Sequence, residues 1–139
     1  MVRLPPATIS LLAVASLSSC TLENFKVEAC ELDDTVGFRI SPIDGWIRDY
    51  QPRPDELYVG VADGRRYENA VVWATRLNHD DFDKRASRTL IVYGQRILGW
   101  ETQQQPKPLS RRVGYAVSIS DGGHHGRAEF ELGKPMPAC

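Results

Sequence analysis

The sequence of 139 residues has no excess of charge of either sign. It contains 17 Lys and Arg against 18 Asp and Glu, which gives a formal net charge of -1. Proteins that hold nucleic acid through its phosphates need a clear excess of cations, so no nucleic-acid partner is expected. With 42% hydrophobic and 25% charged residues, the chain matches a soluble globular protein, and its length suits a single core.

The short motifs that mark many enzymes are also missing. Neither Gly-x-Ser-x-Gly nor Cys-x-x-Cys occurs, so the sequence offers no serine elbow and no redox pair. Carboxylates are plentiful, but pairs such as Glu129 and Glu131 fall on one side of a strand, where a solvated sheet face explains them. We therefore expect a protein that is not an enzyme, with no catalytic residues and no cofactor.

No apolar run is long enough to span a bilayer as a helix, which takes roughly 20 residues. The apolar and small residues 7–17 follow Arg3, a pattern typical of a signal peptide. They end in Leu17-Ser18-Ser19-Cys20, which resembles the lipobox of bacterial lipoproteins. That resemblance implies a signal peptide at 1–19 and a diacylated Cys20 that becomes the new N-terminus.

An ordinary signal-peptidase site after Ala13-Val14-Ala15 is the alternative. It would leave three cysteines in an oxidising compartment, whereas acylation of Cys20 leaves an even pair, Cys30 and Cys139. We expect this pair to form a disulfide that closes a loop of about 110 residues and stabilises the fold by about 4 to 5 kcal/mol. Two free buried thiols are the alternative for the pair.

The lipobox resemblance also predicts where the protein works. It implies a bacterial envelope protein attached to the lipid bilayer through Cys20. Thr21 follows that cysteine, and in the lipoproteins that the chain resembles, the absence of aspartate there favours the outer membrane, facing the periplasm. Residues 20–26 then form the lipidated N-terminus and tether, and 27–139 form the domain.

Within the domain, apolar and polar residues alternate, and helical spacing is scarce. The clearest run has Tyr115, Val117 and Ile119 on one face, and a second run with Ala128 and Phe130 follows a Gly-rich loop at 121–126. Two such runs predict a β-hairpin. Shorter alternating stretches occur around 25–32, 38–40, 57–61 and 71–77.

About seven to nine strands emerge from these stretches, which predicts an all-β fold. An immunoglobulin-like antiparallel β-sandwich is the first interpretation, and a small closed β-barrel is the alternative. The nearly continuous apolar run 89–93 predicts a central strand that is covered on both faces. The charged segment 80–88 predicts a loop or one short helical turn, because Phe82 is its single bulky apolar residue.

Several short motifs between residues 38 and 132 resemble those of small uncharacterised proteobacterial lipoproteins with a β-sandwich body. They are Phe38-Arg39-Ile40-Ser41-Pro42, Tyr93-Gly94, Gly99-Trp100, Pro108-Leu109 and Tyr115-Ala116-Val117. This resemblance implies a location and a fold, and it brings no catalytic residues.

Histidine is the commonest side-chain ligand of borderline metals, and the chain has three. His124 and His125 are adjacent in the expected hairpin loop, and His79 precedes two aspartates. They could share an ion only if the loops bend sharply and lie at the same end of the sandwich. Solvated loop residues are the simpler interpretation, so these three are weak metal candidates.

The tryptophans give a second, weak set of binding candidates. Trp73 alternates with its neighbours and is expected in the core, whereas Trp46 and Trp100 follow glycines at turn edges. These two either cap the sandwich or form an aromatic platform for a sugar or peptide, which requires them to share a surface.

The leading functional hypothesis is a non-enzymatic envelope lipoprotein whose loops bind a protein or glycan. The alternatives are a metal-binding or hydrolytic periplasmic domain that uses loop His and Asp residues, a structural subunit, and an inhibitor of an enzyme, with His124 and His125 as its protruding loop.

Overall fold

The computed structural model describes residues 25–43, 51–62 and 70–139, and most of them lie in β-strands. The elements in chain order are β1 (Phe25–Leu32), β2 (Thr35–Pro42), β3 (Glu56–Val61), β4 (Val71–Leu77), the 3-10 helix η2 (His79–Lys84), β5 (Leu90–Val92), β6 (Trp100–Gln104), β7 (Gly114–Asp121) and β8 (His124–Glu131). The all-β prediction is confirmed, and the charged segment expected to be a loop or one short turn contains part of this 3-10 helix.

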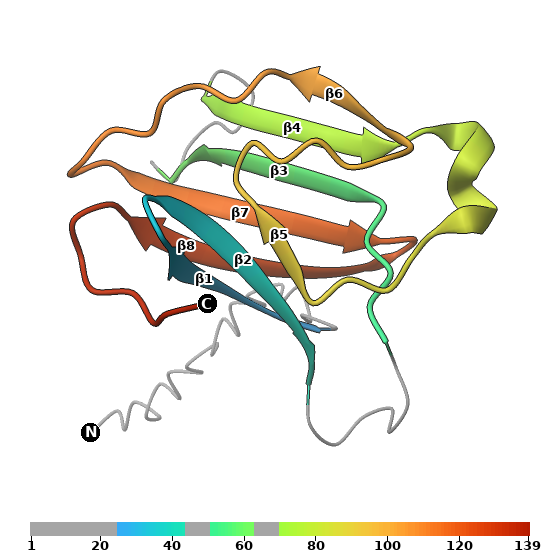
Figure 1. Ribbon diagram of the computed structural model, residues 1–139, viewed down its shortest axis with the longest axis horizontal. Coiled ribbons are helices and arrows are strands. Elements are labelled where there is room, and N and C mark those ends of the chain that lie inside the picture. Colours follow the sequence, from blue (N-terminus) through green and yellow to red (C-terminus); the bar gives the residue numbers. More distant parts are fainter. Residues whose placement is uncertain (1–24, 44–50, 63–69) are drawn as a thin grey trace, which may run out of the picture.

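The strands form two antiparallel sheets that pack face to face (Figure 1). One sheet has the order β1-β2-β5, and the other has the order β6-β4-β3-β7-β8. Within the described part of the chain the sheets do not close on each other, because each has its own edge strands. The architecture is therefore the predicted sandwich and not the alternative barrel.

The core lies between the inner faces of the two sheets. In the larger sheet, Val59 is in register with Trp73 on β4 and Val117 on β7, and none of the three is more than 1% exposed. Phe38 and Phe130 meet across the layers with ring centroids 5.5 Å apart. The apolar residues of the alternating stretches thus point into the core. Trp73 is among them, as predicted.

Strand β1 includes two residues that precede the expected domain boundary at residue 27. Phe25 is the first residue of β1, pairs with Pro42 and is completely buried. Phe25 and Lys26 are therefore part of the sandwich, and Phe25 continues the inward-facing series of Val27 and Ala29.

The run 89–93 is an edge strand, so the prediction of a central, doubly covered strand is wrong. Only three of its residues, Leu90 to Val92, pair with β2. Ile91 fills the core, while Leu90 and Val92 are half-buried on the outer face of the smaller sheet. The apolar side chain of Leu90 has a local role on this outer face. It approaches Gly37 of the neighbouring strand β2, close to both sulfur atoms of the disulfide.

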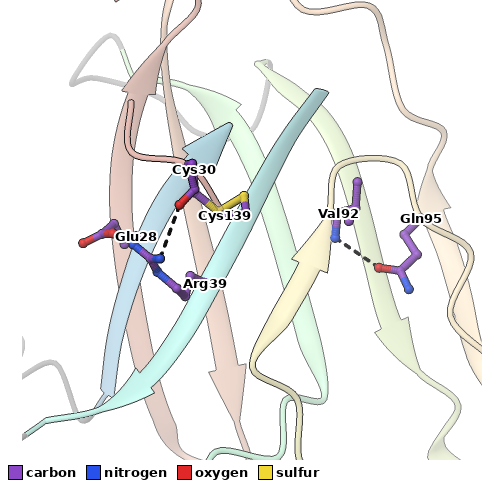
Figure 2. The surroundings of a disulfide bond; sticks show 7 residues. Glu28, Cys30, Arg39, Val92, Gln95 and Cys139 are labelled. Atoms are coloured by element: carbon purple, nitrogen blue, oxygen red, sulfur yellow. Dashed lines mark hydrogen bonds and ion pairs between the residues drawn. A yellow bond between two sulfur atoms is a disulfide. The ribbon is translucent and has the colours of Figure 1, made fainter. Parts of the chain in front are cut away.

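The disulfide between Cys30 and Cys139 is present as predicted, with the two Cα atoms 5.0 Å apart (Figure 2). Both sulfurs lie over Gly37, where a Cβ atom would be 2.8 Å from the Cys139 sulfur. The backbone of Glu31 donates to Pro137 (2.7 Å) and accepts from Cys139 (2.9 Å). The C-terminal segment is thereby held along the free edge of β1.

A close approach of β8 to β1 joins the two sheets along one side. At Gly126, a Cβ atom would lie 2.7 Å from the Phe25 carbonyl oxygen and 2.7 Å from a Val27 methyl group. Only glycine leaves room for these atoms, so the absence of a side chain allows β1 to pack this closely on β8.

A buried ion pair holds the connection between β4 and β5 against the β7–β8 hairpin. Arg85 Nη1 lies 2.8 Å from Asp121 Oδ1, and their side chains are 17% and 7% exposed. The backbone N–H of Arg53 donates to Asp121 Oδ2 (2.8 Å), and the Arg85 guanidinium stacks 4.1 Å above the Phe82 ring. Three segments distant in sequence therefore meet at one carboxylate.

We predict that Gly126→Ala lowers the free energy of unfolding by about 1 to 3 kcal/mol, because the new methyl group must displace the backbone of β1. Urea denaturation monitored by tryptophan fluorescence measures this change. Gly114→Ala on the neighbouring strand is the matched control, since the nearest atom to its Cβ is 4.0 Å away. Equal midpoints for the two variants would contradict the steric account.

Asp121→Asn is expected to cost about 2 to 4 kcal/mol, because it leaves the Arg85 guanidinium partly buried without its opposite charge. The control is Asp81→Asn, which removes an exposed pair with Lys84 (3.1 Å) and is expected to cost less than about 1 kcal/mol. Thermal unfolding of both variants provides the comparison, and a similar loss in each would refute a special role for the buried pair.

Candidate binding surfaces

The antiparallel strands give the sandwich two ends, which we name by a residue at each. The Phe25 end contains the start of β1, the β7–β8 turn, η2 and the start of β6 (Figure 1). The Asp33 end contains the β1–β2 turn, the start of β7 and the segment that follows β8. Each end carries a hollow or an exposed loop that could bind a partner.

At the Asp33 end lies a hollow of about 610 Å³. Three separate segments line it: Glu31, Asp33, Asp34, Thr35 and Val36 from the β1–β2 turn, Arg111 before β7, and Leu132, Gly133, Lys134, Pro135 and Met136 after β8. Val36 is buried, and Leu132 and Met136 are half-buried, so the floor contains a small apolar area within a mainly polar lining. The rim carries three acidic and two basic side chains.

Local structure fixes the position of this rim. Asp33 occupies the turn with a positive φ of 50°, and a bridge joins Arg111 to Leu132. Lys134 lies 2.6 Å from Glu131 Oε2, and the hydrogen bond to that carboxylate raises the pKa of Lys134. The adjacent Cys30–Cys139 bridge holds the C-terminal segment, so the hollow has a rigid wall.

A second hollow of about 800 Å³ lies along the β5–β6 loop and β6. Its lining is Arg96, Ile97, Leu98, Gly99, Trp100, Glu101, Thr102, Gln103 and Gln105. Trp100 pairs with Leu77 at the start of β6 and is half-buried against the core. Its ring therefore contributes to the wall without forming a fully exposed platform.

A tight turn in this loop exposes one leucine completely. The Trp100 N–H donates to the Ile97 carbonyl (3.0 Å), and Gly99 has a φ of +83°, which is the geometry of a type II turn with Gly at its third position. Ile97 is 6% exposed, whereas Leu98 is 98% exposed. The anchored turn thus holds Leu98 away from the protein surface.

Tyr93 fixes the start of the same loop. Its hydroxyl donates to the carbonyl of Lys107 (2.7 Å), and it lies 3.3 Å from the carbonyl of Val72. Its ring contacts Trp73 edge-on, with centroids 5.2 Å apart. Burial, as the main cause, raises the pKa of Tyr93 to about 12, so the hydroxyl stays protonated and remains a donor at neutral pH.

The tryptophan platform is left as a prediction. Trp46 lies outside the described residues, so its position relative to Trp100 is not part of the structure. The half-buried setting of Trp100 fits its expected capping position better than a fully exposed binding platform.

The predicted loop position of His124 and His125 is wrong. Both belong to β8, where they pair with Asp121 and Ser120, and the connecting turn has only Gly122 and Gly123. These glycines have φ values of 59° and 152°, which permit a two-residue turn in place of the longer expected loop. The histidines therefore form no protruding loop of the kind expected for an enzyme inhibitor.

A shared metal site would require His79 to lie at the same end of the sandwich as His124 and His125. This is the case, because η2 begins at His79 and lies beside the β7–β8 turn. Even so, among residues 25–43, 51–62 and 70–139 no group of three or more His, Cys, Asp or Glu is placed to hold a metal ion.

Two features escape sequence reasoning. The Asp33-end hollow joins the β1–β2 turn to two segments that lie about 75 to 105 residues later in the chain, so no local pattern marks it. The Leu98 turn does leave a signal, because Leu98 followed by Gly99 matches the second and third positions of a type II turn, the third of which favours glycine. Its exposure, however, depends on the burial of Ile97, which the sequence alone does not reveal.

Within the described part of the chain, no helix is long and apolar enough to cross a membrane. Comparison with protein-family models, with curated proteins and with solved structures finds no match to this chain.

Proposed function

We propose that this chain is a lipid-anchored lipoprotein of the bacterial cell envelope, and that it acts as a non-enzymatic binding module for an envelope protein. The lipid anchor rests on the lipobox-like sequence that ends at Cys20. The binding role rests mainly on one observation, the rigidly framed hollow at the Asp33 end.

The chemistry of this hollow favours a protein partner over a neutral glycan. A glycan site commonly offers an aromatic ring for a sugar to stack on, but no aromatic side chain lines this hollow. An apolar floor surrounded by charged groups of both signs is instead the usual anatomy of a protein interface. The half-buried Leu132 and Met136 would receive an apolar side chain, and the charged rim would pair with the partner's charges.

The position of the hollow also suits an anchored protein. It lies at the end of the sandwich opposite Phe25, and Phe25 is five residues after Cys20. A chain of that length spans at most about 17 Å, so the Phe25 end stays near the bilayer. The hollow, at the opposite end, then remains open to a periplasmic partner.

The anchor is tested by intact mass spectrometry of the protein extracted from membranes, before and after reduction. We expect the mass of a lipid-modified chain that starts at Cys20, and a gain of two hydrogen atoms on reduction of the Cys30–Cys139 bridge. Cys20→Ala is expected to abolish the lipid mass and release the protein from the membrane fraction. An unmodified wild-type chain that starts at residue 16 would refute the lipoprotein proposal.

The binding role is tested by photo-crosslinking in intact cells. A photoreactive amino acid at Asp34 or Lys134, on the rim of the hollow, is expected to capture one common envelope protein. The same residue at Glu129, which is exposed on the outer face of β8, is the control and is expected to capture none.

Met136→Arg places a charge on the apolar floor and is expected to weaken binding of the captured protein at least about tenfold. Glu129→Arg adds the same side chain outside the hollow and is expected to leave the affinity unchanged. Crosslinks that are equal at the rim and at Glu129, or an unchanged affinity after Met136→Arg, would contradict the assignment of the site.

A further inference from the structure

Large apolar side chains are exposed at four positions of the described chain. They are Ile43, Tyr58, Phe82 and Leu98, with exposed fractions of 39%, 40%, 41% and 98%. Tyr58 stands on the outer face of the larger sheet, in register with Ala74 and Ser118. The other three all belong to the Phe25 end.

Three independent segments bring these side chains to that end. Ile43 directly follows Pro42, which pairs with Phe25. Phe82 lies in η2, and its ring tip is 3.8 Å from the Cβ position at Gly122 in the β7–β8 turn. Leu98 precedes Gly99, whose carbonyl accepts from Asn78 (2.9 Å) just before η2.

The framework beneath two of these side chains is rigid. The type II turn anchored by buried Ile97 holds Leu98 outward. The Arg85 guanidinium stacks on the Phe82 ring and is itself held by Asp121. Single exposed apolar residues are common on protein surfaces. Three of them occur on separate segments at the same end of the sandwich.

The short segment between Cys20 and Phe25 restricts which part of the domain can face the bilayer. Five residues separate Cys20 from Phe25 and span at most about 17 Å, whereas the eight residues of β1 extend over about 23 Å. If the Asp33 end faced the bilayer, Phe25 would stand farther from the surface than the tether can reach. The Phe25 end, or one side of the sandwich, must therefore face the membrane.

We propose that the Phe25 end rests on the bilayer and inserts Ile43, Phe82 and Leu98 at the boundary between headgroups and acyl chains. This inference depends on the lipid anchor proposed above and adds a second membrane contact, made by the folded domain itself. It assigns the tethered module a fixed orientation.

Charges around these side chains indicate how the contact forms. Lys84 and Arg96 are exposed near Phe82 and Leu98, but Asp80, Asp83 and Glu101 are exposed beside them. Mixed charges give little net attraction to anionic lipid. The contact therefore depends on apolar insertion, and it is expected to form on zwitterionic lipid and to persist at high salt.

The orientation can be measured on the full lipidated protein with a single fluorescent label. The bridge occupies Cys30 and Cys139, and the proposed acylation occupies Cys20, so an introduced cysteine is the only free thiol. Leu98→Cys and Phe82→Cys report on the proposed contact. Asp34→Cys at the Asp33 end and Tyr58→Cys on the sheet face are the controls.

Each labelled protein is reconstituted into phosphatidylcholine vesicles that carry spin-labelled lipids with the quencher at known depths. Labels at 98 and 82 are expected to be quenched most strongly about 5 to 10 Å below the headgroup boundary, with no change in high salt. Labels at 34 and 58 are expected to show no quenching.

Vesicle flotation and the intact mass show independently whether the protein carries its lipid anchor, so a wrong orientation can be distinguished from a missing anchor. Unquenched labels at 98 and 82 on a protein that floats and carries acyl chains would overturn the orientation and leave the anchor standing. Quenching at 58 instead would place the sheet face on the membrane and also overturn it. A chain without acyl chains that fails to float would overturn the anchor, and the inference with it.

Discussion

The closure of the domain depends on β1, because three separate parts of the chain are attached to this strand. Its inner edge pairs with β2 along eight residues, its inward face packs on β8 at Gly126, and its outer edge binds the C-terminal segment. The disulfide at Cys30 adds a covalent link at the same place. The start and end of the domain are thereby fixed to each other, which gives the neighbouring hollow a stable wall.

The fold could be predicted from the sequence wherever one face of a strand is buried and the other is solvated. Tyr115, Val117 and Ile119 form such a series on β7. The next inward-facing residue is Asp121, whose burial the sequence pattern does not predict. Here the pattern fails, because a buried carboxylate is tolerated only with a partner, and that partner, Arg85, lies 36 residues away. Strand β6 was missed for a different reason: its exposed glutamate and glutamines have no apolar alternation.

The candidate sites were much harder to predict than the fold. Sequence reasoning favoured histidine and tryptophan because their chemistry is conspicuous, yet His124 and His125 are ordinary strand residues. The Asp33-end hollow consists instead of common acidic, basic and aliphatic residues. Its significance arises from the packing of three segments around the disulfide, and that arrangement becomes visible only when long-range pairing is known.

The pairing of β3 with β7 has a consequence for the time that the chain needs to fold. About 50 residues lie between these strands, and nearly the whole domain separates β1 from its C-terminal partner. Sheets built from such distant segments close slowly, on the order of milliseconds to seconds, because long loops must be ordered before their contacts form. A newly made chain thus remains incompletely folded for a substantial interval, during which its apolar strand faces and unpaired strand edges are open to other proteins.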